Sequence, residues 1–288
     1  MNKDALPGNI SDPFPDLFAS PCGYFESRTS HYTVFRIPSP EDACDITSQE
    51  YNDTEIQPDD ETCQQMVFDS LLAGGFRRAD DFLYRADCPD CRKCVPIRIS
   101  VPDFRPSKSQ RRTLRQNADV SVHIVQTPSD FVTDEKIALY GAYDKRHNPQ
   151  SKKSSDEYRA ELMQMNGIRE SASGIEQARA SYSGTFNMEY RLTPADSRPG
   201  TLIGVGIVDA GTGALSSNYF YYDISEETMK RSIGTYSVLR EIDLCRHLRF
   251  NWYYLGYWIA DCNKMVYKSG FIPHQLLVNG RWQSAENQ

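Results

Sequence analysis

The spacing of apolar residues along the chain predicts which segments are helices and which are strands. Over 62–73 apolar residues recur at helical spacing and stop at the Gly-Gly pair 74–75, so a helix should end there. Over 95–101 they occupy every second position, with Arg98 on the other face, as in a half-buried strand. Because proline has no N–H to donate, Pro96 predicts that this strand lies at a sheet edge or begins there.

The same patterns predict helices in the middle of the chain and mainly strands after them. The expected helices are 107–117, 133–146, 156–165 and 235–250. The expected strands are 186–192, 201–209, 215–223 and 252–259. Ser107 follows a proline and suits the N-cap of the first helix. The turn at 210–213 should make the second and third strands an antiparallel hairpin.

Three segments lack this periodicity and are expected to be irregular. Residues 1–20 are rich in Pro, Asp and Gly, which predicts a poorly ordered lead-in. Residues 38–62 are acidic and rich in turn formers, so we expect an exposed loop that is in part an insertion. Residues 171–184 are small and polar and predict a mobile loop.

Composition indicates an ordinary globular protein, with 39% apolar and 25% charged residues among 288. The N-terminus has no secretory apolar region, and no apolar run is long enough to span a membrane. We therefore expect a cytoplasmic protein with no membrane partner. Its eight cysteines should then be reduced, which favours thiolate chemistry or metal binding over disulfides. A net charge of -7 argues against bulk coating of nucleic acid, though not against one local basic site.

Three cysteines at C-x-x-C-x-x-C spacing are the first candidate site. Two residues between thiolates allow Cys88 and Cys91 to reach one ion, and Cys94 could add a third ligand. Cys22, Cys63 or a histidine could supply the fourth. The candidate ligand is a zinc ion or an iron–sulfur cluster. The alternative is a tight turn in which reduced cysteines serve as small apolar residues.

A basic helix follows the cysteines and is the second candidate site. Its four cations lie at i, i+3, i+4 and i+7 and so share one face. They are Lys108, Arg111, Arg112 and Arg115. Such a face attracts the phosphates of a nucleic acid, tRNA among them, or of another polyanion. The alternative is a solvated face whose charge is balanced by the acidic segment 41–61.

A strand, loop and helix near residue 230 suggest the fold. Arg231-x-x-Gly234 resembles the pyrophosphate loop of the GNAT acyltransferases, where backbone amides at a helix N-terminus bind an anion. Tyr236 replaces the final small residue of that loop and should crowd coenzyme A. We therefore expect an α+β, GNAT-like fold, with a mixed, mainly antiparallel sheet and flanking helices. The expected domains are 1–118, with the cysteines and the basic helix, and 119–288, the GNAT-like part.

Many ordered blocks resemble the aminoacyl-tRNA–protein transferases, which include bacterial leucyltransferases and arginyltransferases. The N-terminal blocks are Cys22-Gly-Tyr24, Gly75-Phe-Arg-Arg78, Tyr84-Arg85, the cysteine cluster, Phe104-Arg-Pro-Ser107, Arg111-Arg112 and Asn117-Ala-Asp119. The C-terminal blocks are Leu139-Tyr140, Arg146-His147, Met188-Glu-Tyr-Arg191, Ser232-Ile-Gly-Thr-Tyr236, Leu255-Gly-Tyr257 and Lys264-Met265-x-Tyr267-Lys268. The resemblance implies transfer of an amino acid from charged tRNA to the α-amine of a protein that begins with Asp or Glu, which marks that protein for N-degron degradation.

This activity needs a reaction centre, a cationic pocket for the acidic terminus and an RNA-facing surface. The candidates for the reaction centre are Tyr257, Lys264, Tyr267, Lys268 and Glu189. The candidates for substrate binding are Arg28, Arg77, Arg78, Arg85, Arg146 and His147. The basic helix is the candidate surface for tRNA. For each charged residue the alternative is a structural ion pair, and the tyrosines could be core residues.

Departures from the bacterial pattern leave the donated amino acid open between leucine, which we favour, and arginine. The segments 148–153 and 271–275 differ from the bacterial type, and Phe25 replaces the second cysteine of the eukaryotic C-G-Y-C motif. The reaction requires no cofactor because the aminoacyl ester is already activated. The metal ligands would be Cys22, Cys88, Cys91 and Cys94. Two rival functions are a coenzyme A-dependent N-acetyltransferase and a non-catalytic RNA- or metal-binding module.

Overall fold

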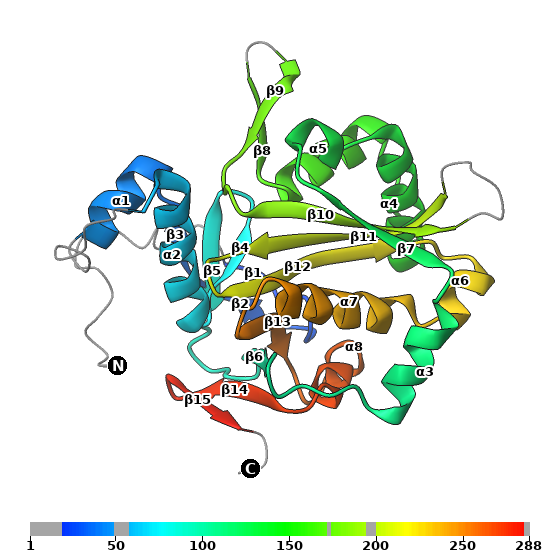
Figure 1. Ribbon diagram of the computed structural model, residues 1–288. Coiled ribbons are helices and arrows are strands. Elements are labelled where there is room, and N and C mark those ends of the chain that lie inside the picture. Colours follow the sequence, from blue (N-terminus) through cyan, green and yellow to red (C-terminus); the bar gives the residue numbers. More distant parts are fainter. Residues whose placement is uncertain (1–18, 49–57, 172–173, 194–199, 285–288) are drawn as a thin grey trace.

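The fold is organised around one eight-stranded sheet, seen in the computed structural model, which describes residues 19–48, 58–171, 174–193 and 200–284 (Figure 1). In spatial order the strands are β15 (Arg281–Ser284), β14 (His274–Val278), β6 (Val95–Ser100), β13 (Trp252–Trp258), β12 (Ala214–Tyr222), β11 (Thr201–Ala210), β10 (Thr185–Leu192) and β7 (Val120–Val125). All neighbours pair antiparallel except β12 and β13, which are parallel. The expected mixed, mainly antiparallel sheet is confirmed.

Helices cover both faces of this sheet, as expected (Figure 1). On one face α7 (Ile233–His247) packs on β12 and β13, and α3 (Lys108–Gln116) packs on α7. On the other, α4 (Asp134–His147) packs on β11 and β12 and is joined by α5 (Ser155–Met165). Ser107 caps α3 by accepting the N–H of Gln110, so the predicted N-cap is confirmed. The turn before β12 makes the predicted antiparallel hairpin with β11.

The N-terminal part packs against one end of the large sheet and has its own apolar core. It contains β1 (Ser20–Pro21), β2 (Thr29–Ser30), β3 (Tyr32–Arg36), β5 (Phe82–Ala86), β4 (Arg77–Ala79), α1 (Pro40–Ser48) and α2 (Asp60–Ala73). Its core includes Ala214 and Tyr254 from the large sheet. The helix predicted over 62–73 is α2, and Gly74 ends it. Within the described residues, no helix has the length and apolar character needed to cross a membrane.

Two expectations for the N-terminal part were wrong. The acidic segment 38–62 contains α1, whose first turn carries Glu41 and Asp42. Acidic side chains in the first turn interact favourably with the helix dipole and stabilise the helix, so residues typical of a loop also begin a helix. The cysteines were expected to be reduced, but Cys44 and Cys63 form a disulfide between α1 and α2. The packing of these two helices brings the Cα atoms to 5.0 Å.

Other expectations for irregular or edge segments also need correction. The loop predicted over 171–184 contains most of a β-hairpin of β8 (Ile168–Ser171) and β9 (Gly174–Ala180), which projects from the body (Figure 1). Backbone pairing defines this hairpin, so an apolar pattern could not predict it. β6 is an interior strand and Pro96 is its second residue, so of the two predicted positions for this proline the one at the start of the strand is confirmed. Most of the predicted lead-in, residues 1–18, lies outside the described residues.

The division at residues 118 and 119 stays a prediction. β6, from before that point, pairs with β13 and β14 from after it. A buried ion pair also joins the two parts. Arg78 Nε donates to Asp209 Oδ1 at 2.9 Å, and both side chains are at most 1% exposed. Arg78 also donates to the backbone carbonyls of Asp80 and Met165. It was a candidate for substrate binding, but its burial gives it a structural role.

We predict that Arg78→Met lowers the free energy of unfolding by about 3–5 kcal/mol, because Asp209 would be left as an unpaired buried charge. Equilibrium denaturation in urea measures this change. The matched control is Arg112→Met on the exposed face of α3, which should change stability by less than about 0.5 kcal/mol. Equal effects of the two substitutions would contradict the structural role of Arg78.

Candidate active site

The parallel strands β12 and β13 pair over only three register positions and then separate. The pairs are Ala214↔Trp252, Leu215↔Tyr253 and Ser216↔Tyr254. Beyond them β12 pairs only with β11, and β13 pairs with β6. A bulge lies in β12 where the separation begins, because Val208 faces Ser217 whereas Ile207 faces Tyr219. The backbone of Ser217 therefore has no partner on β13 and is free to accept a hydrogen bond.

Arg77 from β4 fills the start of this separation. Its Nη2 donates to the backbone carbonyl of Ser217 on β12. On the other side its Nη1 lies over Gly256 of β13, where a Cβ would clash with the guanidinium. Gly256 also has φ +84, a conformation that side chains rarely adopt. The guanidinium thus lies between the two strands, and a glycine is required for it to fit. We call this place, defined by Arg77, Ser217 and Gly256, the strand-separation site.

A second cation, Lys268, borders the same site. It lies in η2 (Tyr267–Gly270), is 8% exposed, and its Nζ donates to the carbonyl of Tyr257 at 2.8 Å. Burial, together with the nearby charge of Arg77, lowers the pKa of Lys268 to about 7. In the described part of the chain, neither Arg77 nor Lys268 forms an ion pair with a carboxylate. Arginine is always charged and Lys268 can be protonated, so two such groups without a carboxylate partner among the described residues predict that an anion binds here.

Tyrosines line the side of the site toward the N-terminal part. The ring of Tyr84 lies 5.5 Å from Tyr32 and 6.3 Å from Tyr257. Tyr257 Oη accepts the N–H of Ala86 at 3.0 Å. Burial raises the pKa of Tyr24 to about 12 and also raises those of Tyr84 and Tyr257. These phenols stay neutral, so they offer hydrogen bonds without neutralising Arg77.

A buried acid lies beneath the strands, on the face covered by α7. Glu241 has no solvent exposure, and its Oε2 accepts the hydroxyl of Tyr253 at 2.7 Å. Its Oε1 has no hydrogen-bond partner, and burial raises the pKa of Glu241 to about 7. Gly206 of β11 lies over Oε1, where a Cβ would be 3.4 Å away, an ordinary contact. Glu241 could not be predicted from the sequence, because one acid in an amphipathic helix has no signal of its own.

Tyr257, Tyr267 and Lys268 are the predicted reaction-centre residues that the structure brings together. Tyr267 is 47% exposed, at the open side. Partial burial and the charge of Glu241 raise the pKa of Tyr267 to about 12, and the charge of Arg77 opposes the rise. Lys264 is exposed on the neighbouring α8 (Asn263–Val266).

Glu189 does not belong to the strand-separation site. It lies on β10, where its carboxylate is 3.0 Å from Lys136 Nζ and 2.9 Å from Arg191 Nη2. The two cations lower its pKa although burial acts in the other direction. Between the two roles that the sequence left open, the structure supports the buried ion-pair partner rather than the base.

Other predicted binding residues are dispersed around the site. Arg28 is exposed and its guanidinium lies 5.2 Å from the ring of Phe25. Arg85 donates to the carbonyl of Gly74 and lies 4.7 Å from the ring of Phe76. At the end of α4, Arg146 is exposed, and His147 packs on Tyr143 with ring centres 4.3 Å apart. The structure therefore singles out Arg77 among the predicted arginines.

The four cations of α3 are exposed, and none forms an ion pair within the described residues. The acidic segment that could have balanced them does not do so where it is described. This arrangement suits a phosphate-binding surface.

The predicted ligand cysteines lie near one another in space. Burial and the neighbouring thiols, among them Cys88, Cys22 and Cys262, raise the pKa of Cys94 to about 12. Cys88 Sγ accepts a hydrogen bond from the backbone N–H of His31, and Cys91 Sγ accepts one from Nη1 of Arg28. Across the described ranges no three Cys, His, Asp or Glu side chains are placed to hold a metal. Metal binding by Cys22, Cys88, Cys91 and Cys94 stays a prediction, and the chemistry below uses no metal.

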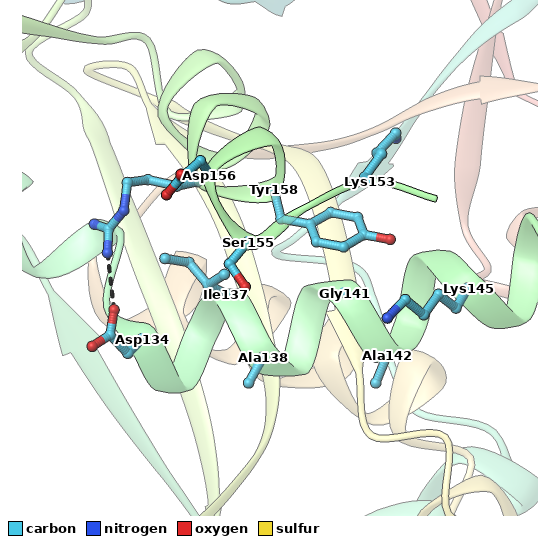
Figure 2. Close-up of a pocket in the computed structure, with 11 residues that line it drawn as sticks. Asp134, Ile137, Ala138, Gly141, Ala142, Lys145, Lys153, Ser155, Asp156 and Tyr158 are labelled. Atoms are coloured by element: carbon cyan, nitrogen blue, oxygen red, sulfur yellow. Dashed lines mark hydrogen bonds and ion pairs between the residues drawn. The ribbon is translucent and has the colours of Figure 1, made fainter. Parts of the chain in front are cut away.

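A separate cavity of about 440 Å³ lies between α4 and α5 (Figure 2). Asp134 and Arg159 form an ion pair at one end, and Lys145 and Lys153 lie toward the other. None of the residues predicted for the reaction lines this cavity. The chemistry is therefore assigned to the strand-separation site.

Two solved structures of other proteins show a weak likeness to this fold. The C-terminal domain of a putative lysylphosphatidylglycerol synthetase from Agrobacterium fabrum gives a TM-score of 0.39 at 11% identity, over 59% of this chain and 48% of that one. FemX gives 0.38 at 8% identity, over 68% of this chain and 61% of that one. Both TM-scores are below 0.5, so these likenesses support no functional conclusion.

The sequence matches a known family along nearly its whole length. The profile "Arginine-tRNA-protein transferase, N terminus" matches residues 20–112, and the corresponding C-terminal profile matches 135–278. An aspartate/glutamate leucyltransferase of Saccharophagus degradans is 33% identical over 272 residues, 92% of this chain and 95% of that one. One of Nitrobacter hamburgensis is 35% identical over 218 residues, 74% and 77% of the two chains. The chain therefore belongs to the arginine-tRNA-protein transferase family and is an aminoacyltransferase that uses aminoacyl-tRNA and a protein substrate.

Proposed function

We propose that this enzyme transfers leucine from charged tRNA to the N-terminal α-amine of proteins that begin with Asp or Glu, which marks them for N-degron degradation. The observation that carries the proposal is the unpaired cation pair, Arg77 and Lys268, at the strand-separation site. A carboxylate that binds there receives charge-assisted hydrogen bonds from both. The relatives' name, aspartate/glutamate leucyltransferase, supports the same acceptor and the choice of leucine over arginine.

The acceptor side chain would position the reacting amine. With the carboxylate of an N-terminal Asp or Glu on Arg77 and Lys268, the α-amine lies only a few bonds away. Its unperturbed pKa is about 8, and neighbouring positive charge lowers it, so a large neutral fraction exists at neutral pH. Without that carboxylate the cations would repel a protonated amine. The site therefore selects acidic termini in two ways: it attracts their carboxylate, and it repels a protonated amine that has no carboxylate beside it.

The donor needs no further activation, because the amino acid arrives as an ester. The neutral amine nitrogen attacks the ester carbonyl, a C–N bond forms and the C–O bond to the ribose breaks. The nitrogen loses a proton, and the ribose hydroxyl leaves with one. Holding amine and ester in contact supplies much of the rate, and a nearby N–H or cation stabilises the oxyanion. No residue of the site has to form a covalent intermediate.

The topology supports a GNAT-like acyltransferase fold, whereas the loop at Arg231 does not support the use of acetyl-CoA. One parallel strand pair separates after three residues, beside a bulge in β12, and this is where we place the two substrates. The loop at Arg231 does not favour coenzyme A, because Arg231 pairs with Asp119 at 2.7 Å and with Glu227 at 3.1 Å. The predicted crowding by Tyr236 is not the reason. Its ring is buried in the core, and its hydroxyl donates to the carbonyl of Val120.

The α3 surface would hold the acceptor stem of the tRNA. Its four cations, which form no ion pair with the described residues, make a single positively charged face in a chain of net charge -7. The rest of the chain offers little attraction to RNA, so this face can orient the tRNA. The N-terminal part, with its cysteines, supplies Arg77 to the site and completes it.

The decisive assay measures transfer of labelled leucine or arginine from charged tRNA to peptides that begin with Asp, Glu or Ala. We expect leucine on the Asp and Glu peptides and little on the Ala peptide. Arg77→Gln should lower kcat/KM for the acidic peptides by about 30–100-fold, because a charge-assisted hydrogen bond is lost. The matched control is Arg85→Gln on the next strand, which should change it by less than about threefold.

Three results would contradict the proposal. Transfer of arginine instead of leucine would overturn the donor. Equal transfer to the Ala peptide would show that the enzyme does not require an acidic acceptor. A larger loss for Arg85→Gln than for Arg77→Gln would show that the carboxylate binds at Arg85 instead.

Proton uptake gives an independent test of Lys268. Its amine has a pKa of about 7, so at pH 8 it is mostly neutral in the free enzyme. A bound carboxylate favours the charged amine and raises that pKa, so Lys268 contributes an uptake of close to one proton when an acidic peptide binds, against which the peptide's α-amine releases part of one. Calorimetry in buffers with different heats of ionisation measures the number. In Lys268→Met this uptake should disappear, and an unchanged value would show that Lys268 does not face the carboxylate.

A further inference from the structure

Glu241 on α7 is a buried acid to which the proposed reaction assigns no role. Its carboxyl has no solvent exposure, Oε2 accepts the hydroxyl of Tyr253, and Oε1 has no hydrogen-bond partner among the described residues. No cation in the described part of the chain forms an ion pair with it. An acid in such a place costs free energy that an apolar side chain would not. Its presence therefore calls for a local reason.

Glu241 meets both strands at the point where they separate. Figure 1 shows α7 lying along β12 and β13. Tyr253 of β13 pairs with Leu215 of β12, and strand alternation places Ser217 on the same face as Leu215. Burial raises the pKa of Glu241 and that of Tyr253, and the hydroxyl of Ser217 opposes the rise in both. The carboxyl therefore lies close to one polar side chain from each strand.

Ser217 connects this buried group with the strand-separation site. Its backbone carbonyl accepts the hydrogen bond from Arg77, and its side chain lies on the α7 side, near Glu241. Ser217 is half-buried, whereas Glu241 is fully buried. The backbone pairing with β13 has ended by Ser217, and the bulge in β12 begins there. Its contacts with Arg77 and Glu241 thus take the place of the missing strand partner.

We infer that Glu241 is a positioning residue: by holding Ser217 and Tyr253 from the α7 face, it fixes the separation of the two strands. In this way it sets the place of the Arg77 guanidinium. The inference rests on the proposed function for the role of Arg77 in binding the acidic terminus. A guanidinium donates in fixed directions, so a displaced carbonyl at Ser217 would also displace the charge that the carboxylate has to meet.

The burial of Glu241 favours positioning over direct proton transfer. A general base must come within hydrogen-bond reach of the proton that it removes. Glu241 has no solvent exposure, and the tyrosine that donates to it, Tyr253, is fully buried as well. The carboxyl therefore acts on the site through Ser217 and not on the substrate.

A double-mutant cycle between Glu241 and Arg77 tests the inference. The assay measures kcat/KM for leucine transfer to peptides that begin with Asp or Ala. Glu241→Leu should lower the value for the Asp peptide about tenfold, because a displaced guanidinium binds the carboxylate poorly. In the Arg77→Gln background the same substitution should lower it less than about twofold, because the group that it positions is absent. The Ala peptide should lose less than about twofold in either background.

Two further variants locate the link. Ser217→Ala removes the hydroxyl and keeps the carbonyl that binds Arg77, so it should reproduce most of the loss in Glu241→Leu and add little to it. Glu241→Gln keeps an acceptor for Tyr253 and a polar group beside Ser217, so it should recover at least about a third of the wild-type value.

Equilibrium denaturation in urea reads the same link without the reaction. If Glu241 and Arg77 are joined through Ser217, the effects of their single substitutions on the free energy of unfolding should not add in the double variant. The matched control is Ile242→Val, at a fully buried neighbour on α7. It should keep kcat/KM for both peptides within about twofold, and its effect should add to that of Arg77→Gln in urea.

The inference is overturned if Glu241→Leu costs as much in the Arg77→Gln background as in the wild type, or if it slows transfer to the Asp and Ala peptides alike. Equal losses in Glu241→Gln and Glu241→Leu, or additive effects in urea, would overturn it too. Failure of the proposed function would look different. The enzyme would then show no preference for acidic peptides, while non-additive effects in urea would still support the link between Glu241 and Arg77.

Discussion

The position of the Arg77 guanidinium between β12 and β13 is the constraint on which the active site depends. Two parallel strands that part after three pairs leave backbone groups without partners. Arg77 satisfies one of them, the carbonyl of Ser217, and keeps its other donors within the opening. The opposite strand allows this only because residue 256 is glycine. A single side chain thus completes the backbone hydrogen bonding and supplies positive charge where the substrates would meet.

The neighbouring Arg78 explains how Arg77 is held there. In a strand, consecutive side chains point to opposite faces, so β4 directs one arginine to the site and the other into the protein. Arg78 is fixed by Asp209, which also accepts hydrogen bonds from Thr185 at 2.9 Å and Asn218 at 3.2 Å.

Hydrogen bonds between α2 and the β11–β12 turn form a second connection between the two parts of the chain. The Asp69 carboxylate accepts the backbone N–H of Thr212 at 2.9 Å and that of Gly213 at 2.8 Å. These contacts tie the N-terminal part to the strands that separate. A site built from two parts of the chain can therefore keep a fixed geometry.

The sequence predicted the elements whose patterns are local. Helices such as α3 and α4 have caps and helical spacing, and strands such as β11 alternate or form apolar runs. The β8–β9 hairpin and α1 were missed, because neither has an apolar pattern that differs from a loop. For the site, the resemblance supplied the arginines but could not rank them. Arg77 and Arg78 are adjacent and chemically identical, and only the tertiary fold decides which one is buried.

Glu241 shows the same limit in another way. Its carboxyl is isolated from water beneath Gly206, and this depends on three strands and a helix meeting at one point. No residue near it in sequence indicates that environment.

The protonation states around the site fit a reaction between an amine and an ester. Burial favours the neutral form of both Lys268 and Glu241. It lowers the pKa of the lysine and raises that of the acid, so both values are near 7. In the free enzyme the positive charge at the site therefore comes mainly from Arg77, which is permanently charged. If the proposed acidic terminus binds, its carboxylate would offset the energetic cost of charging Lys268, so the charged form of Lys268 would increase on binding. Peptides without the acidic side chain would meet a weaker field and a poorly positioned amine. Under the proposed function, selectivity would follow from the burial of Lys268 as much as from direct contact.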